Sequence, residues 1–428
     1  MLGPAWNAQL RDESTAFGPL AVSDAARNLA LWRWASPLGQ AFFHAPIFFL
    51  YWNQSLPVAH VLQLEAVYYL SVVVLEVPSG VFSDRVGRLR TLRLSAAAGV
   101  LAYALFFFFQ GFAAFAAAQT LLAVHFAFRS GTSAAWHFEL LESEGRAHEF
   151  PEREAQLARH GFWVRAACGL SGGAVGIWML GGAYALSCLA AVAVLALLFV
   201  SREVPVSAPH ASPFLHGIGR SLARLRNPWL AWIFATVVLR TTLDHIPYEF
   251  VQPWLATALG ARGIDPVRTP LATGALIAAV AVVGGWAAGW APPLLRRLGA
   301  AWTLLGVMIV QTAVIAALAS AVHPLLAVLV LFRSVQPAVA TVVVDAVVAP
   351  VVPASERATY LSLHSLAGRA GYGAVLLALG AVVGPVAVMS PAELRAALSV
   401  SAVLGGVGIA ALALTRGRAS RAAPEAVA

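Results

Sequence analysis

The chain has 428 residues, of which 60% are hydrophobic and only 11% are charged. Soluble domains carry about 25% charged residues, so this composition excludes an ordinary soluble protein and indicates a protein of the lipid bilayer. The net charge of +8 does not indicate nucleic-acid binding, because the basic residues fall in short turns between long apolar runs.

The apolar runs predict membrane spans, each of which needs about 20 residues. We place twelve of them at residues 31–52, 58–79, 92–112, 114–138, 161–181, 183–201, 229–256, 271–291, 301–320, 323–348, 361–384 and 394–414. The predicted fold class is therefore an all-α integral membrane protein with twelve transmembrane helices. An even number of spans puts both termini on the same side.

The basic residues, all of them arginine, predict which side that is. Most lie in the termini or in alternate turns, and only Arg262, Arg268 and Arg395 lie in the opposite turns. Because positively charged turns stay on the inside, we expect a multi-pass protein of the cytoplasmic (inner) membrane with both termini in the cytoplasm. The first 26 residues are polar and show no cleavable signal, so we expect the first span to direct insertion.

A short polar turn follows the second span and contains Gly80, Asp84, Arg85, Gly87 and Arg88. The glycines allow close approach and unusual backbone angles. The aspartate can cap the next helix or pair with an arginine. The pattern Gly80-x-x-x-Asp84-Arg85-x-Gly87-Arg88 resembles the loop signature of the major facilitator superfamily, which lies between its second and third helices.

This resemblance implies a monomeric transporter that works by alternating access, with two six-helix halves around a central substrate path. As parts of a cytoplasmic gate, we expect Glu139 and Glu142 to pair with Arg85 or Arg88, and Arg357 to lie near Asp84. Loss of Asp84 should then weaken one conformational state and leave the binding pocket intact.

An internal repeat supports two related halves. When the first half is shifted by 204 residues, Phe128-Arg129-Ser130 falls on Phe332-Arg333-Ser334. In the same register Arg153, His160, Arg165, Gly169 and Gly176 fall on Arg357, His364, Arg369, Gly373 and Gly380. We predict six-helix bundles at 1–201 and 229–428, related by a pseudo-two-fold axis along the membrane normal, and a cytoplasmic linker at 202–228. Within the linker, 214–226 fits either a helix on the inner leaflet or a simple basic tether.

Ionisable side chains inside spans are the candidates for function. Each costs about 2.5–3.5 kcal/mol on insertion, so such side chains usually face a cavity or a partner. For substrate binding or proton coupling we select Glu65, Arg129, Arg165, Arg240, Asp244, His245, Glu249, Arg333, Asp345 and Arg369.

The seventh span holds the densest group of these residues. Arg240 and Asp244 are four residues apart, as are His245 and Glu249, so each pair shares a helix face. Poor solvation favours a neutral carboxyl, so Asp244 or Glu249 could exchange protons near neutral pH. Alternatively, each pair simply neutralises itself.

Two further motifs resemble parts of efflux transporters. Arg333-Ser-Val-Gln336 resembles the Arg-x-x-Gln pattern that drug-efflux members carry in their fourth span, where the arginine is associated with proton transfer. A purely structural role for Arg129 and Arg333, binding backbone carbonyls, remains open. The glycine-rich segment 169–176 resembles the antiporter signature loosely but lacks its Gly-Pro pair, so we interpret it as helix packing through small residues.

The preferred function is proton-coupled export of a small organic molecule, with protons and membrane lipids as the other partners. Uptake of a nutrient or metabolite, movement of a lipid, and a non-transporting sensor or assembly partner are the alternatives. The sequence has no nucleotide-binding glycine loop, no His-Glu-x-x-His and no nucleophile elbow, so we expect neither an enzyme nor a cofactor. Cys168 and Cys188 lie in apolar runs and predict neither a disulfide nor a metal site.

Overall fold

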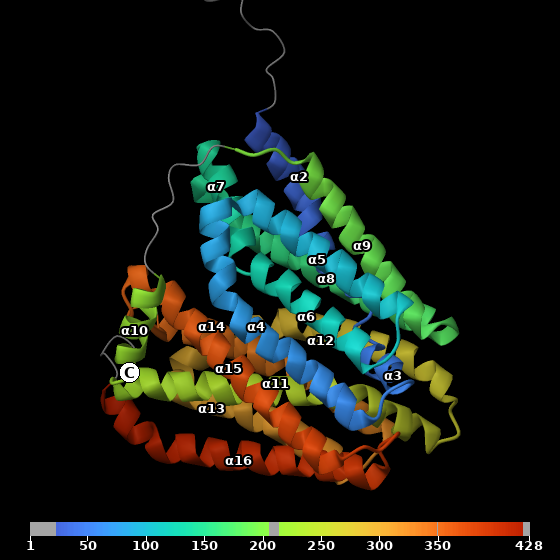
Figure 1. The fold of residues 1–428 in the computed structure, drawn as a ribbon. Coiled ribbons are helices and arrows are strands. Elements are labelled where there is room, and N and C mark those ends of the chain that lie inside the picture. The colour runs from blue at the N-terminus through green and yellow to red at the C-terminus, as the bar shows by residue number, and fades with distance from the viewer. Residues whose placement is uncertain (1–22, 205–213, 349, 423–428) are drawn as a thin grey trace, which may run out of the picture.

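The structure is a computed structural model that describes residues 23–204, 214–348 and 350–422, and these residues form helices joined by short connections (Figure 1). The first part contains α2 (Asp24–Leu38), α3 (Phe48–Asn53), α4 (Val58–Val86), α5 (Arg88–Phe108), α6 (Phe112–Arg129), α7 (Thr132–Ser143), η1 (Ala147–Glu149), α8 (Phe150–Trp178) and α9 (Leu180–Val200). The second part contains α10 (Phe214–Arg224), α11 (Pro228–Gly260), η2 (Pro266–Arg268), α12 (Thr269–Ala287), η3 (Ala288–Trp290), α13 (Ala291–Ser320), η4 (Pro324–Ser334), α14 (Val335–Val348), α15 (Ala354–Val383) and α16 (Pro391–Arg421).

These helices confirm the predicted all-α architecture with twelve spans. Among the described residues, eight stretches are long and apolar enough to cross a membrane, and the stretch Pro266–Ser320 contains two of the predicted spans. The other three predicted spans correspond to α2 with α3, to α8 and to α11.

The prediction of a continuous first span at 31–52 is wrong. The helix starts earlier, at Asp24, ends at Leu38, and resumes at Phe48 after an irregular stretch. Pro46 lies in this stretch and has no backbone N–H to donate, which disfavours a regular helix there.

The fourth and tenth spans also change course, at equivalent points of the repeat. The fourth span breaks at Ser130 and Gly131, whose φ is +71°, a conformation that favours glycine. The tenth span changes from a 3₁₀-helix to an α-helix after Ser334, which lies 204 residues beyond Ser130. Arg129 and Arg333, beside these changes, contact the end of α2 and α11, respectively.

The helices form two groups, α2–α9 and α11–α16 (Figure 1). They converge at the end that carries α3, which we call the loop side. They diverge toward the end that carries α7, α10 and the last turn of α16, which we call the terminal side. The helices of the two groups therefore lie farther apart on the terminal side than on the loop side.

Helices α8 and α12 join the two groups through glycines. A Cβ added at Gly173 would lie 2.4 Å from the carbonyl oxygen of Pro270, and one at Gly274 would lie 2.3 Å from that of Gly169. A Cβ at Gly172 would lie 1.9 Å from the carbonyl oxygen of Phe43 in the irregular stretch. Only glycine allows backbones this close, so the packing interpretation of segment 169–176 is confirmed.

Helices α4 and α15 form the second junction between the groups. A Cβ added at Gly373 would lie 3.2 Å from the side chain of Leu70, and one at Gly380 would lie 3.4 Å from the carbonyl oxygen of Ala59. This junction is looser than the first, because the positions that match Gly172 and Gly173 in the repeat are leucines in α15.

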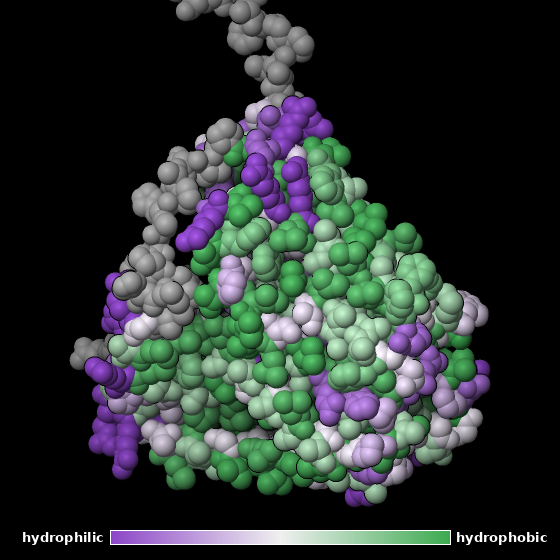
Figure 2. Space-filling view, viewed as in Figure 1, coloured by the Kyte–Doolittle hydropathy of each residue, from purple (hydrophilic) through white to green (hydrophobic). Residues whose placement is uncertain are grey.

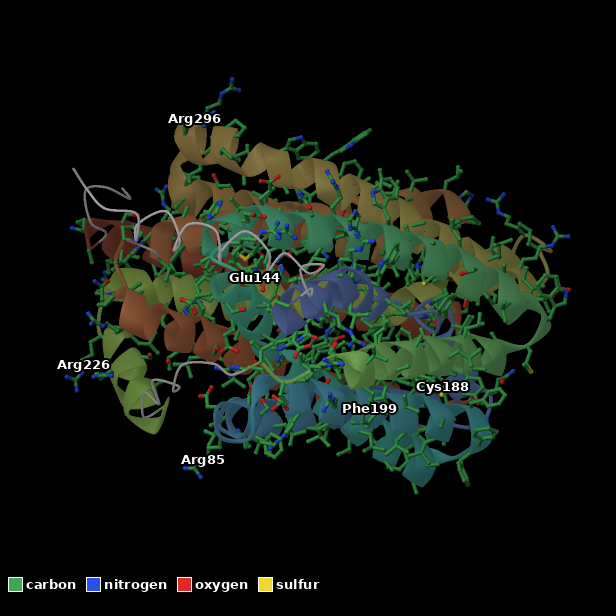
Figure 3. The ribbon with its side chains drawn as sticks, turned by 90° about the horizontal axis from the view of Figure 1, so that it is seen from above. Arg85, Glu144, Cys188, Phe199, Arg226 and Arg296 are labelled. Atoms are coloured by element: carbon green, nitrogen blue, oxygen red, sulfur yellow. The ribbon has the colours of Figure 1, made fainter. Side chains whose placement is uncertain are left out.

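The outer surface fits a lipid environment. Large apolar side chains such as Trp178 and Leu414 are more than four-fifths exposed, and Figure 2 shows apolar residues across the middle of one face with polar residues near its ends. In Figure 3, Arg85, Arg226 and Arg296 point outward in the half of the view that holds the terminal side. We therefore describe the chain as a multi-pass membrane protein.

Candidate functional site

The irregular stretch of the first span is held by an arginine from the fourth. Arg129 donates hydrogen bonds to the carbonyl oxygens of Gly39, at 2.5 Å, and Ser36, at 3.1 Å. Carbonyls at the end of a helix lack partners within it and carry partial negative charge, so a cation stabilises them. Arg129 thus completes the C-terminal end of α2.

Gln252 of α11 supports the same stretch from the second group. Its Nε2 donates to the carbonyl oxygen of Ala45 at 3.0 Å, and its Oε1 accepts from the backbone N–H of Phe49 at 3.1 Å. Sequence analysis missed this residue, although a lone amide within an apolar span was a usable signal. Its contacts satisfy the backbone where the helix is interrupted and tie α11 to the first group.

Two hydrogen bonds to backbone carbonyls also join the groups on the loop side. Asn53 Nδ2 donates to the carbonyl oxygen of Ala387 at 2.8 Å, and the N–H of Val58 donates to that of Val386 at 2.9 Å. Together with the glycine contacts of α8 and α12, these bonds close the loop side.

Arg333 repeats the role of Arg129 in the second group. Its Nε donates to the carbonyl oxygen of Asp244 at 3.2 Å, and Gln336 Nε2 donates to that of Arg240 at 3.0 Å. Arg129 and Arg333 thus both contact backbone carbonyls of the first helix of their own group, as the structural alternative predicts. Their predicted part in proton transfer remains a prediction.

The seventh-span residues do not pair as their spacing suggested. Asp244 lies 3.7 Å from Arg333, and among the described residues it forms no ion pair with Arg240. His245 donates from Nδ1 to the carbonyl oxygen of Thr241 at 2.7 Å and does not pair with Glu249. Neither pair therefore forms a direct ion pair within α11, and Asp244 lies beside Arg333 of η4 instead.

Glu65 of α4 and Glu249 of α11 form a buried acid pair between the groups. The two carboxyl groups lie side by side, and the residues are 7% and 0% exposed. Gln119 donates to Glu65 at 3.1 Å, whereas neither oxygen of Glu249 has a hydrogen-bond partner of ordinary geometry among the described residues. Two adjacent buried carboxyls repel each other when both are ionised, so ionisation of one disfavours ionisation of the other.

Aromatic rings surround this acid pair. The ring of Tyr69 lies 4.9 Å from that of Tyr372 and 5.3 Å from that of His245, and the rings of His245 and Tyr372 are 4.9 Å apart. These residues come from α4, α15 and α11, so the cluster lies where the two groups meet. Tyr69 and His245 lie one helical turn from Glu65 and Glu249, on the side of the acid pair that faces the terminal side.

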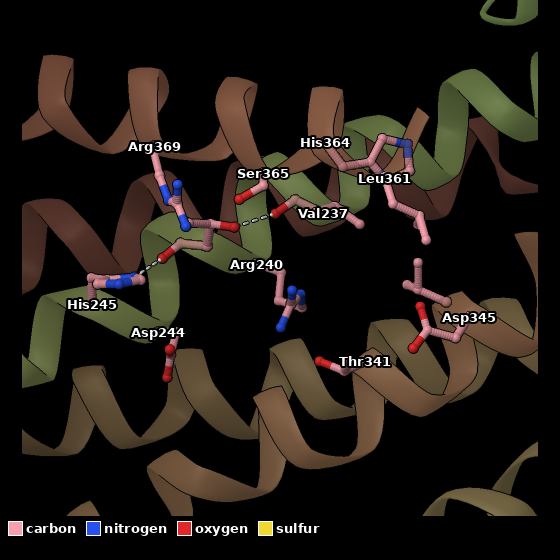
Figure 4. A pocket seen from close by; sticks show the side chains of 12 residues that line it. Val237, Arg240, Asp244, His245, Thr341, Asp345, Leu361, His364, Ser365 and Arg369 are labelled. Atoms are coloured by element: carbon pink, nitrogen blue, oxygen red, sulfur yellow. Dashed lines mark hydrogen bonds between the residues drawn. The ribbon is translucent and has the colours of Figure 1, made fainter. Parts of the chain in front are cut away.

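A polar cavity of about 360 Å³ lies on the terminal-side flank of this cluster, between α11, α14 and α15. Its lining includes Arg240, Asp244, His245, Asp345, His364 and Arg369. Figure 4 shows Arg240 in the middle of the lining, with Asp244 on one side and Asp345 on the other. The cavity brings together five residues selected from the sequence: Arg240, Asp244, His245, Asp345 and Arg369.

A second, mainly apolar cavity of about 480 Å³ lies between the two groups and shares Asp244 with the first. Phe42, Phe162 and Arg165 line it from the first group, and Tyr248, Ile277 and Arg333 line it from the second. Pockets of this size suit drug-sized molecules. The two cavities together provide an apolar lobe and a charged lobe that meet at Asp244.

An ion pair at the level of these cavities joins the two groups. Arg369 Nη1 of α15 lies 2.8 Å from Glu76 Oε2 of α4, and Ser130 also donates to Glu76, at 3.4 Å. Sequence analysis selected Arg369 but missed Glu76, an acid within the apolar run before Pro78. The cross-group hydrogen bonds described above all lie between the loop side and this ion pair.

The predicted gate residues lie on the terminal side, within the first group. Arg88 pairs with Asp84 at 2.6 Å and with Glu139 at 3.2 Å, so the expected contact between Glu139 and Arg88 is present. Glu142 is exposed and, among the described residues, pairs with neither Arg85 nor Arg88, so that part of the expectation is wrong. Arg85 is exposed, and Gly87 has a φ of +104° at the turn into α5. A Cβ added at Gly80 would meet nothing within 4 Å. The structure does not describe the side chain of Arg357, so its expected position near Asp84 stays a prediction.

The sequence matches no family model and no curated protein. Solved structures match the fold. The nucleoside transporter NupG aligns with a TM-score of 0.76 at 12% identity, covering 91% of this chain and 98% of its own. An auto-inhibited peptide transporter of the POT family aligns with a TM-score of 0.72 at 12% identity, covering 92% of this chain and 97% of its own. A D-xylose-proton symporter aligns with a TM-score of 0.62 at 14% identity, covering 88% of this chain and 96% of its own.

Proposed function

From the acid pair and the adjoining cavities, we propose that this chain is a secondary active transporter, with the major facilitator fold that its similarity to the solved structures shows. It moves a small organic molecule by alternating access and couples this movement to protons. We place its terminal side in the cytoplasm, because the terminal-side turns carry most of the arginines. The structure then corresponds to a state open to the cytoplasm.

The observation that carries the coupling proposal is the Glu65–Glu249 pair. It is buried where the two helix groups meet, so a rocking motion changes its surroundings. A proton held there in one state is released when the pair separates or gains water in the other state. Asp244, which links the two cavities, is the second candidate for a coupling carboxylate.

Export is the preferred direction, because Arg333-Ser-Val-Gln336 resembles the drug-efflux pattern. Proton-driven uptake is the second candidate, since the D-xylose-proton symporter has the same fold. The two cavities argue against a non-transporting sensor, for which a sealed interior is expected.

Proteoliposomes loaded with an isotope-labelled extract of small cellular molecules test transport without assuming a particular substrate. We expect at least one molecule to cross only with protein present, and faster when a pH gradient is imposed. Glu249→Gln should retain flux but lose its response to the gradient, whereas Glu152→Gln, an exposed acid in the first turn of α8 on the terminal side, should behave like the wild type.

Either of two results would contradict the proposal. Absence of any protein-dependent flux would reject transport. Flux that ignores the gradient in the wild type would reject proton coupling. The sign of the gradient that drives accumulation, in vesicles of known protein orientation, separates export from uptake.

A further inference from the structure

The charges around the two cavities do not balance. Together the cavities are lined by four arginines, Arg165, Arg240, Arg333 and Arg369, but by only two acids, Asp244 and Asp345. Glu76 adds a third acid through its pair with Arg369. Among these lining residues and their pair partners the arginines therefore outnumber the acids by one, in a space where uncompensated charge is costly.

Arg240 lies between Asp244 and Asp345, Arg333 pairs with Asp244, and Arg369 pairs with Glu76, which leaves Arg165 without an acidic partner among the described residues. Among the described residues it forms no ion pair, its buried Nε has no hydrogen-bond partner, and its guanidinium lies 4.5 Å from the ring centroid of Phe162. Arg129, a second cation, lies within electrostatic range of it. A guanidinium placed over an aromatic ring keeps its outward N–H groups free to bind an incoming anion.

The shape of the cavity specifies the rest of the ligand. Beside Arg165, the 480 Å³ cavity is lined by Phe42, Tyr248, Ile277 and further apolar residues, which suit an apolar or aromatic body. Asp244 lies where the two cavities meet, and its Oδ1 has no hydrogen-bond partner among the described residues. That carboxylate disfavours a second negative charge on the ligand.

We propose, on the basis of the proposed function, that the transported molecule is an organic monoanion with an apolar body. Its anionic group binds Arg165, and its body fills the cavity between Phe42 and Ile277. It enters from the aqueous phase on the terminal side, toward which the helices of the two groups diverge. A fatty acid or an anionic lysophospholipid has the same chemistry but would come from the bilayer.

Binding of phenylbutyrate to the full-length protein in phosphatidylcholine nanodiscs tests this inference. Phenylbutanamide and phenylbutylamine have the same apolar body with a neutral or a cationic end. We expect phenylbutyrate to bind saturably and its amide and amine analogues not to bind. In Arg165→Gln the affinity for phenylbutyrate should fall roughly tenfold to a hundredfold. Arg165→Lys, which keeps the charge, should recover part of the affinity. Arg268→Gln, an exposed arginine on the loop side, should not change it.

Several results would overturn the inference: no saturable binding of phenylbutyrate, equal binding of its amide or amine, or unchanged affinity in a folded Arg165→Gln. Saturable binding of lysophosphatidylglycerol without binding of phenylbutyrate would also overturn it, by assigning the site to a lipid from the bilayer. Phenylbutyrate binding without protein-dependent flux in the extract experiment would reject transport but not the anion site. Gradient-driven flux of neutral molecules without phenylbutyrate binding would reject the anion site but not transport.

Discussion

The carboxylate of Glu76 in α4 lies 2.8 Å from the guanidinium of Arg369 in α15, and this ion pair joins the two helix groups. Toward the loop side α4 and α15 stay in contact, at Leu70 with Gly373 and at Ala59 with Gly380. Toward the terminal side, α4 has open space beside Gly80. The ion pair therefore marks the level at which the groups separate and belongs to the state that is open on the terminal side.

Removing this ion pair should shift the conformational equilibrium. Glu76→Gln weakens an interaction of the terminal-open state. We therefore expect the population of the terminal-closed state, relative to the terminal-open state, to rise at least about fivefold, which corresponds to ~1 kcal/mol. Spin labels at Arg85 and Arg296, which point outward from the two groups, can report the terminal-side distance in a background of Cys168→Ala and Cys188→Ala. The shorter distance should become more populated.

The reversed pair, Glu76→Arg with Arg369→Glu, is the matched control for that experiment. It should restore the wild-type distances if the attraction itself matters. Wild-type distances in Glu76→Gln alone would show that the ion pair does not bias the equilibrium.

Periodic features of the sequence allowed most of the fold to be predicted. Long apolar runs identify spans because lipid offers no partner for backbone groups, and the 204-residue repeat identified Arg129 and Arg333 as equivalent. The structure confirms that equivalence, since both arginines donate to carbonyls of the first helix in their own group.

The missed features depend on contacts between distant segments. Gln252 matters because the first span breaks at residues 39–47, and that break was not predicted. Pairing of Glu65 with Glu249, and of Glu76 with Arg369, depends on how α4 packs against α11 and α15. Spacing along a single helix predicted the wrong partners for Asp244, because its nearest cation, Arg333, comes from the tenth span.

Gln252→Leu should destabilise the protein. The substitution leaves the carbonyl of Ala45 and the N–H of Phe49 without their partner in a buried setting. Each unsatisfied buried group costs about 1–3 kcal/mol, so the apparent melting temperature in detergent should fall clearly. Gln156→Leu, on an exposed position of α8, is the control and should melt like the wild type. Equal melting of both variants would mean that Gln252 does not support the broken span.

Gly173→Ala should open the loop side. The new Cβ would lie 2.4 Å from the carbonyl oxygen of Pro270, so α8 and α12 must separate, and such overpacking typically costs about 1–3 kcal/mol. Spin labels at Phe109 and Arg268 on the loop side should then show longer distances. Gly285→Ala, whose Cβ meets nothing within 4 Å, should leave them unchanged. An unaltered loop-side distance in Gly173→Ala would show that the glycine contact is not needed for closure.

Asp84→Asn should favour the terminal-open state without damaging the binding site. Asp84 is 44% exposed and, among the described residues, pairs only with Arg88, one helical turn away; such a pair contributes less than about 1 kcal/mol. In the closed state we expect α15 to approach α4 at Gly80, which would bring Arg357 within reach of Asp84. The substitution removes that contact, so the longer distance between labels at Glu142 and Arg296 should become more populated.

Asp24→Asn provides the matched comparison for Asp84→Asn, because Asp24 is also a terminal-side acid and pairs with Arg202 at 3.0 Å within the first group. It should leave the distances unchanged, since it has no expected partner across the opening. Phenylbutyrate affinity should stay within about twofold of the wild type in both variants, because the cavities lie away from both acids. Intact transport with abolished binding in Asp84→Asn, or an equal shift in Asp24→Asn, would reject a gating role for Asp84.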